Sequence, residues 1–135
     1  MVTIDIQYQG DLRCEAVHQP SGTHLTTDAP KDNHGKGESF SPSDLVATAL
    51  GTCMLTIMGI AARSMNVDLK GTHVTVQKEM VATPLRRIGK LTVQIKVPGQ
   101  FTDEQKQKLE RAAYTCPVHK SLNEDIQIPV EFVWD

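Results

Sequence analysis

Residues 45–62, LVATALGTCMLTIMGIAA, decide the fold, because these eighteen positions hold no charged side chain. A run of this length reaches the lower limit for a helix that spans a membrane. Thr48, Thr52 and Thr56 recur at intervals of four and two glycines interrupt the run, so one flank is mildly polar. A helix that is otherwise apolar nearly all round is typical of the centre of a domain. We therefore expect a buried central helix and no membrane partner.

The residues before this run carry the signals of a helix start. Ser41 is a favourable N-cap, and Pro42 follows it in the first turn, where its missing N–H costs nothing. Asp44 lies near the positive end of the helix dipole. Together these signals predict a long helix from about residue 42 to about residue 64.

Alternating and capping patterns predict the other elements. Thr102 and Gln105 have the spacing of a capping box, which opens a helix that ends near residue 114, and Pro117 starts a short helix. The expected strands cover residues 3–8, 12–18, 24–27, 72–81, 91–97 and 126–134, with a functional loop at 28–39. This order is not a regular βαβ alternation, so it predicts an α+β fold with a mainly antiparallel sheet in a single domain, residues 1–135.

Charge and cysteine content exclude several classes of protein. Fourteen Lys and Arg against sixteen Asp and Glu give a net charge of −2, so no basic surface for nucleic acid is expected. Three cysteines cannot form the paired framework of a small secreted domain. The first ten residues lack the basic and apolar segments of a secretory signal. These features favour a cytoplasmic protein.

The central helix also predicts a second subunit. A single sheet built from a chain of 135 residues covers one face of a helix and leaves the other face in water. Exposed apolar patches of that size are rare on monomers. We therefore expect a homodimer in which a second copy covers the remaining face.

The three cysteines differ in their expected surroundings. Cys53 lies in the middle of the central helix, too far from its N-terminus for the helix dipole to lower its pKa. Cys116 precedes Pro117 at a helix start, where unpaired N–H groups favour a thiolate, so local physics makes it the better candidate for a low pKa. Cys14 lies on a strand and is expected to be inert.

Two other chemistries could use these side chains. Cys116 and His119 have the spacing of a metal-ligand pair, but no second close pair of ligands accompanies them. A Cys–His hydrolase would need a base and an orienting group that the spacing alone does not supply. The sequence favours neither, so no metal site is expected.

Two segments together carry a resemblance to a known family. The first is residues 37–53, GESFSPSDLVATALGTC, and the second is residues 115–118, TCPV. Their residues and separation resemble the OsmC/Ohr family, the osmotically inducible and organic-hydroperoxide-resistance proteins, which are thiol-dependent peroxidases. The resemblance implies an OsmC-like intertwined homodimer, with sheets wrapped around two long central helices.

The resemblance also implies a reaction. Cys53 would attack an organic hydroperoxide and become a sulfenic acid, Cys116 would resolve it as a disulfide, and an external dithiol would reduce that disulfide. No metal or organic cofactor is needed. Met54, Ile57 and Met58, with residues of the second subunit, would line an apolar substrate pocket.

The residues that would activate Cys53 depart from the family pattern. The resemblance implies an arginine on an early strand, held by a glutamate near the start of the central helix. The matching positions hold Gly10 and Ser43, so Arg13 is the nearest arginine and Glu38 the preferred acid, with Asp44 expected to be an exposed first-turn residue. Solvated charges with no role in the site are the alternative.

Two other functions stay open on the sequence alone. The first is a non-enzymatic dimer of the same fold that binds a small or lipid-like molecule. The second is a stress-associated interaction protein in which both cysteines are spectators. Consumption of peroxide with a dithiol, and rapid disulfide formation, would separate these from a peroxidase.

Overall fold

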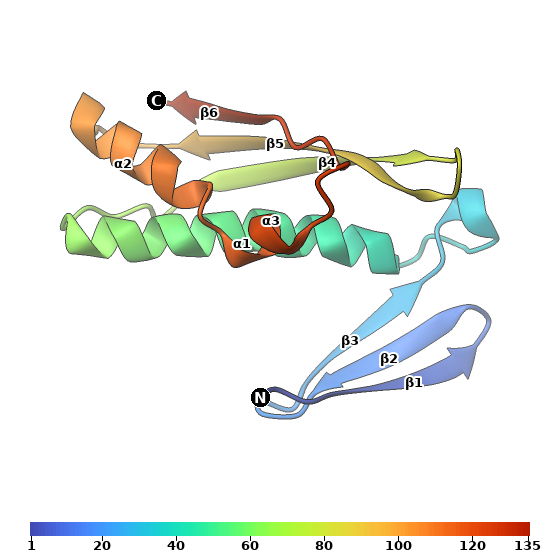
Figure 1. The fold of residues 1–135 in the computed structure, drawn as a ribbon. Helices are drawn as coiled ribbons and strands as arrows, with labels where there is room; N and C mark the ends of the chain where they lie inside the picture. The colour runs from blue at the N-terminus through green and yellow to red at the C-terminus, as the bar shows by residue number, and fades with distance from the viewer. The chain divides into compact units, whose positions relative to one another are not determined.

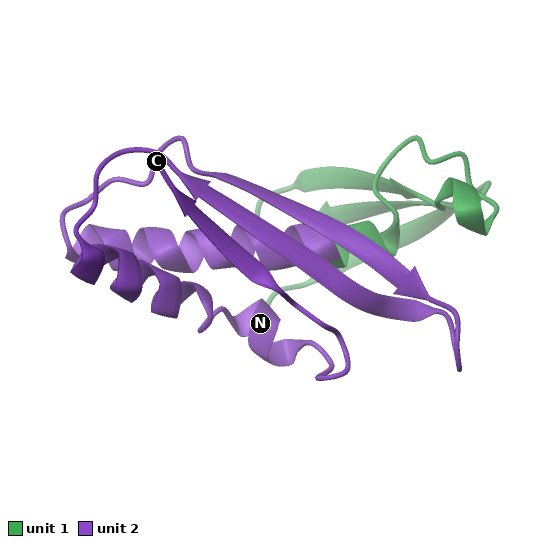
Figure 2. Ribbon diagram, turned by 90° about the horizontal axis from the view of Figure 1, so that it is seen from above, with its two compact units in different colours: residues 1–46 green, residues 47–135 purple.

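The computed structural model describes residues 1–135, whose contacts fall into two compact units, Met1–Val46 and Ala47–Asp135 (Figure 2). The mixed α+β class predicted from the sequence is confirmed. The joining of the two units into a single domain over residues 1–135 stays a prediction.

The first unit is a three-stranded antiparallel sheet followed by a loop. Its strands are β1 (Ile4–Gly10), β2 (Arg13–His18) and β3 (Thr23–Asp28), in the order β1-β2-β3. Gly10, Asp11 and Leu12 all have positive φ, so a tight turn joins β1 to β2. The loop contains a single 3₁₀ turn, η1 (Lys31–Asn33). The meander predicted from the sequence is therefore confirmed.

One face of this sheet is apolar and exposed. Ile4, Ile6 and Tyr8 alternate along β1 and so point to the same face. Ile6 pairs with Ala16 on β2, which pairs in turn with Leu25 on β3. Ile4, Ile6, Tyr8 and Leu25 are between 44% and 68% exposed. The first unit thus presents a surface that one chain leaves uncovered.

The second unit packs helices on another three-stranded sheet. The long helix α1 (Pro42–Ser64) begins before this unit and lies along β4 (His73–Val81), β5 (Arg87–Val97) and β6 (Val130–Trp134) (Figure 1). β4 pairs with β5 in antiparallel fashion, and β6 pairs with β5 in parallel. The helices α2 (Asp103–Ala113) and α3 (Pro117–Ser121) lie between β5 and β6 in the chain.

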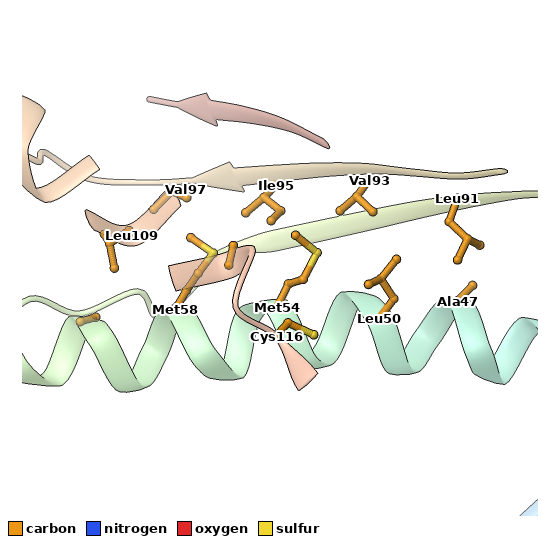
Figure 3. Packing of buried hydrophobic residues seen from close by; sticks show 12 residues of the cluster. Ala47, Leu50, Met54, Met58, Leu91, Val93, Ile95, Val97, Leu109 and Cys116 are labelled. Carbon is orange, nitrogen blue, oxygen red and sulfur yellow. The ribbon is translucent and has the colours of Figure 1, made fainter. Parts of the chain in front are cut away.

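The core of the second unit forms between α1 and the central strand β5. Leu50, Met54 and Met58 lie on one face of α1 at helical spacing and are fully buried. Figure 3 shows these side chains pointing toward β5. The other fully buried members of the cluster are Leu91, Val93, Ile95, Val97, Leu109, Ala113 and Cys116.

The opposite face of α1 is exposed in a single chain. Between the two ends of the helix, exposed positions recur every three to four residues: Thr48, Thr52, Thr56, Ile60 and Arg63. α1 is long and apolar enough to cross a membrane by length and composition, a test that the core helix of a soluble protein also passes. The expectation of a fully buried helix is therefore met on one face only.

Helix ends follow the sequence more closely than strand ends. The capping box predicted for α2 is present, with Thr102 and Gln105 each accepting the other's backbone N–H. β5 begins at Arg87 rather than at residue 91, and a register shift follows Glu79 on its partner β4. The last strand begins at Val130 rather than at residue 126, with only an isolated bridge from Gln127 to Lys90 before it.

Candidate active site

The second unit brings Cys53 and Cys116 together. Cys53 lies midway along α1 and is half-buried, whereas Cys116 is the fully buried N-cap of α3. The two side chains are within hydrogen-bonding reach of each other, and both are free thiols. Two sulfurs that are far apart in the chain therefore lie side by side.

The turn after α2 places Cys116 in the core. Thr115 donates its backbone N–H and its hydroxyl to the carbonyl of Ala112, and the Cys116 N–H reaches the carbonyl of Ala113. Pro117 then starts α3 at once. The Cys116 Sγ accepts the backbone N–H of His119 at 3.3 Å. Backbone contacts on both sides of Cys116 thus fix its side chain.

The electrostatics of Cys116 contradict its predicted low pKa. Burial is the largest influence and raises the pKa of the Cys116 thiol, and the neighbouring Cys53 raises it further. The backbone N–H groups of His119 and Val118 act in the opposite direction with a smaller effect. The prediction was wrong because the helix start lies in a fully buried place, where loss of water disfavours the charged thiolate.

His119 has a packing role in this structure. Its backbone N–H reaches Cys116, while its ring makes an edge-on contact with Tyr114 at 6.2 Å between centroids. Phe132 on β6 packs on the same Tyr114 ring at 6.1 Å. The structure gathers no group of three or more His, Cys, Asp or Glu side chains that could hold a metal ion.

The three predicted pocket residues divide between core and surface. Met54 and Met58 are fully buried in the cluster under β5. Ile57 is partly buried, packs against the same cluster and keeps exposed surface. A substrate-binding role for these side chains stays a prediction.

The first unit brings Arg13 and Glu38 together, as the sequence predicted for this pair. Arg13 is on β2, and its Nη2 lies 2.8 Å from Glu38 Oε2. The bond from Glu38 is the largest of the influences that raise the pKa of the Arg13 guanidinium. Asp44 instead helps to cap α1. Its carboxylate accepts the backbone N–H of Ser41, and the Ser41 hydroxyl accepts the backbone N–H of Asp44. Whether Arg13 and Glu38 activate Cys53 stays a prediction.

A third charged residue, Asp28, joins this pair and was missed by the sequence analysis. Asp28 is the last residue of β3, lies opposite Arg13 in the β2–β3 register and is 1% exposed. Its Oδ2 is 3.4 Å from Arg13 Nη2 and accepts the backbone N–H of Glu38 at 3.0 Å. The Glu38 N–H is the main cause that lowers the pKa of Asp28. Asp28 directly follows the strand predicted at residues 24–27 and is the first residue of the predicted loop, and this position at a strand end is the signal that the sequence offers.

Comparison with known proteins agrees with these features. A family model described as OsmC-like protein matches residues 35–131, which include Glu38, Cys53 and Cys116. No curated protein matches the sequence.

Solved structures share the fold over nearly the whole chain. A Psychrobacter arcticus 273-4 protein, provisionally named as an osmotic stress induced and detoxification response protein, is 46% identical, with a TM-score of 0.92 and coverage of 98% of this chain and 96% of that one. An organic hydroperoxide resistance protein OsmC from Legionella pneumophila is 14% identical, with a TM-score of 0.79 and coverage of 98% and 96%. The organic hydroperoxide resistance protein OhrB of Bacillus subtilis is 16% identical, with a TM-score of 0.71 and coverage of 98% and 97%.

Proposed function

The chain belongs to the OsmC-like protein family, and from this premise we propose that it is a thiol-dependent peroxidase that reduces organic hydroperoxides. The observation that carries the proposal is the closeness of the Cys53 and Cys116 side chains, which lie near enough for Cys53 to raise the pKa of Cys116. Two adjacent thiols can give up two electrons and form a disulfide without a cofactor. The names of the hydroperoxide resistance proteins that share the fold support the same chemistry.

In the first step, the Cys53 thiolate attacks the terminal oxygen of the hydroperoxide. The O–O bond breaks and an S–O bond forms, so Cys53 becomes a sulfenic acid and the leaving alkoxide takes a proton to become an alcohol. The sulfur loses two electrons to the peroxide. Cys53 suits this step because its side chain keeps exposed surface, while burial and its neighbour keep Cys116 protonated.

In the second step, the Cys116 sulfur attacks the Cys53 sulfur. An S–S bond forms, the S–O bond breaks, and the hydroxyl leaves as water with the Cys116 proton. The closeness of the two side chains supports this step. An external dithiol of a reducing cytoplasm then returns the disulfide to two thiols by two exchanges.

Activation of Cys53 is proposed to come from Arg13, oriented by Glu38. A thiol with an ordinary pKa is only a few per cent ionised at neutral pH, so a nearby cation is needed to raise its reactivity. The pairing of Arg13 with Glu38 at 2.8 Å supports this role. Apolar side chains near Cys53, of which Ile57 keeps exposed surface, favour an organic substituent over hydrogen peroxide.

The test is consumption of tert-butyl hydroperoxide with dithiothreitol as the reductant. We expect Cys53→Ser to abolish turnover and Cys116→Ser to allow one oxidation step without an intramolecular disulfide. Cys14→Ser is the matched control, because Cys14 lies on β2 in the first unit, and it should retain full turnover. Multiple turnover in Cys53→Ser, or none in the unmodified protein, would overturn the proposal.

A further inference from the structure

The loop that carries Glu38 is fastened to the end of β3. The Asp28 N–H donates to the carbonyl of Phe40 at 3.0 Å, and the Ser39 hydroxyl donates to the carbonyl of Thr26 at 2.7 Å. Gly37 donates its N–H to the carbonyl of Ala29 at 3.2 Å. The residues on both sides of Glu38 therefore have fixed backbone positions.

The Asp28 carboxylate is the centre of this arrangement. Its Oδ2 accepts the Glu38 N–H at 3.0 Å and faces Arg13 Nη2 at 3.4 Å, so one oxygen contacts both members of the proposed activating pair. The backbone N–H of Ala29 and the charge of Lys36 add to the influences that lower the pKa of Asp28. A carboxylate held by such groups stays ionised at neutral pH.

The two acids that face Arg13 differ in how deeply they are buried. The Asp28 side chain is 1% exposed, whereas the Glu38 side chain is 57% exposed. An exposed ion pair contributes little and leaves a long side chain free to move, while a buried carboxylate has one fixed position. Glu38 thus lies closer to the Arg13 guanidinium, whereas Asp28 is the acid whose position is fixed by burial.

The surroundings of the second carboxylate oxygen of Asp28 indicate a role other than stability. Asp28 Oδ1 is buried and has no hydrogen-bond partner in the structure. Leaving a buried acceptor unpaired costs free energy, and local arrangements of this kind tend to occur at functional sites. An asparagine would keep an acceptor for the Glu38 N–H without carrying this charge.

We propose that Asp28 is the positioning residue for Arg13, and that it acts in two ways: by facing the guanidinium directly and by holding the Glu38 backbone. This inference rests on the proposed function only for the effect of Arg13 on Cys53. Glu38 supplies the closest ion pair, and Asp28 sets where that pair lies. Asp28 itself touches no reacting atom.

The test measures Cys53 alone. Iodoacetamide alkylation is followed against pH in a Cys14→Ser, Cys116→Ser background, so that one thiol reports. We expect Asp28→Asn to move the midpoint upward by about one pH unit, equivalent to about tenfold less thiolate at neutral pH. Asp11→Asn is the matched control, because Asp11 contributes a nearby charge to Arg13 from a turn whose positive φ asparagine tolerates, and it should leave the midpoint in place.

A double variant separates positioning from general damage. Arg13→Ala should move the midpoint as Asp28→Asn does, and adding Asp28→Asn to Arg13→Ala should then have no further effect. An unchanged midpoint in Asp28→Asn beside a shifted one in Arg13→Ala would overturn the proposal. An additive shift would overturn it as well, because Asp28 would then act without Arg13.

A direct readout of Arg13 keeps the two proposals distinguishable. If Arg13→Ala leaves the Cys53 profile unchanged, activation by Arg13 fails, and the positioning claim is judged on the Nε–H signal of Arg13 in a ¹⁵N NMR spectrum. We expect that signal to be ordered in the unmodified protein and in Asp11→Asn, and to broaden or move toward free arginine in Asp28→Asn. An unchanged Arg13 signal in folded Asp28→Asn would contradict the positioning role.

Discussion

At the residue scale, Cys53 and Cys116 differ in their surroundings. Cys53 is partly buried and keeps some exposed surface on α1 in a single chain. Cys116 has none, and its surroundings raise its pKa. Under the proposed function, the partly buried Cys53 suits attack on a substrate, and the fully buried, protonated Cys116 suits the later attack on its neighbour.

The raised pKa of Cys116 predicts a loss of stability in base. The native state holds the Cys116 proton more tightly than the unfolded chain does, so this contribution is fully present below the ordinary value of 9.0 and is lost as pH rises through the native pKa. Denaturant unfolding under reducing conditions should show a steeper fall above that pH in the unmodified protein than in Cys116→Ala. Cys14→Ala serves as the control and should keep the steep fall. Equal slopes in the unmodified protein and Cys116→Ala would count against the burial argument.

The lowered pKa of Asp28 predicts the opposite dependence in acid. The unfolded chain binds the proton more readily, so the contribution of Asp28 is fully present above its ordinary value of 3.8 and is lost as pH falls through the native pKa. The free energy of unfolding of Asp28→Asn should therefore change less than that of the unmodified protein between about pH 5 and about pH 2, the range in which carboxyl groups titrate. Parallel acid profiles would show that the Asp28 charge is not stabilised in the native state.

The sequence led to the pairing of Arg13 with Glu38 but not to the contact of Asp28 with both, for physical reasons. Glu38 and Arg13 could be paired because a loop residue can reach a strand residue nearby. The burial of Asp28 depends on its register against Arg13 and on how the loop folds back, which local patterns do not specify. The prediction of a low pKa for Cys116 was wrong because the pKa depends on tertiary burial, whose effect outweighs that of the helix start.

At the scale of elements, α1 owes its fit against the sheet to a glycine. A Cβ added at Gly51 would lie 3.0 Å from Val76 Cγ2 and 3.5 Å from Val74 Cγ1 on β4. Alanine is ordinarily better than glycine inside a helix by about 1 kcal/mol. The close approach of β4 is the reason for a residue that weakens the helix itself.

Substitution at Gly51 tests this packing. Gly51→Ala should fail to give the usual gain in the free energy of unfolding, because Val76 must move to admit the new methyl group. The same substitution in a Val76→Ala background should give a gain of about 1 kcal/mol, measured by denaturant unfolding against Val76→Ala alone. A full gain from Gly51→Ala in the unmodified protein would show that the contact is loose.

Among the elements, local signals predicted helices better than strand ends. The start of α1 and the capping box of α2 depend on residues next to each other in the chain. The start of β5 depends on its partner, since pairing with β4 continues past a register shift to Arg87. The parallel pairing of β6 with β5 is likewise a long-range feature that alternation along one strand does not reveal.

At the scale of the whole molecule, one chain leaves an apolar sheet face and one face of a long helix in water. The sheet face carries Ile4, Ile6 and Tyr8, and the outer face of α1 carries threonines together with Ile60. On α1, Thr52 and Thr56 donate their hydroxyls to carbonyls four residues back, so these groups are satisfied within the helix. Surfaces of this kind on a folded chain favour a second subunit.

We expect a homodimer of about twice 14.9 kDa by sedimentation at micromolar concentration. Ile6→Lys should weaken the dimer by placing a charge on the apolar sheet face. Gln7→Lys is its matched control, because Gln7 is exposed on the other face of the same strand and should leave the dimer intact. A stable monomer of the unmodified chain with native helix content would show that no second copy covers these surfaces.

Under the proposed function, oxidation by a peroxide ends in a disulfide between Cys53 and Cys116. The most direct measurement adds one equivalent of tert-butyl hydroperoxide to the reduced protein and maps the products by mass spectrometry. We expect one equivalent of tert-butanol, a Cys53–Cys116 disulfide within one chain, and a Cys53 sulfenic acid that dimedone traps in Cys116→Ser. Unconsumed hydroperoxide, or a disulfide that joins Cys14 as the main product, would contradict it.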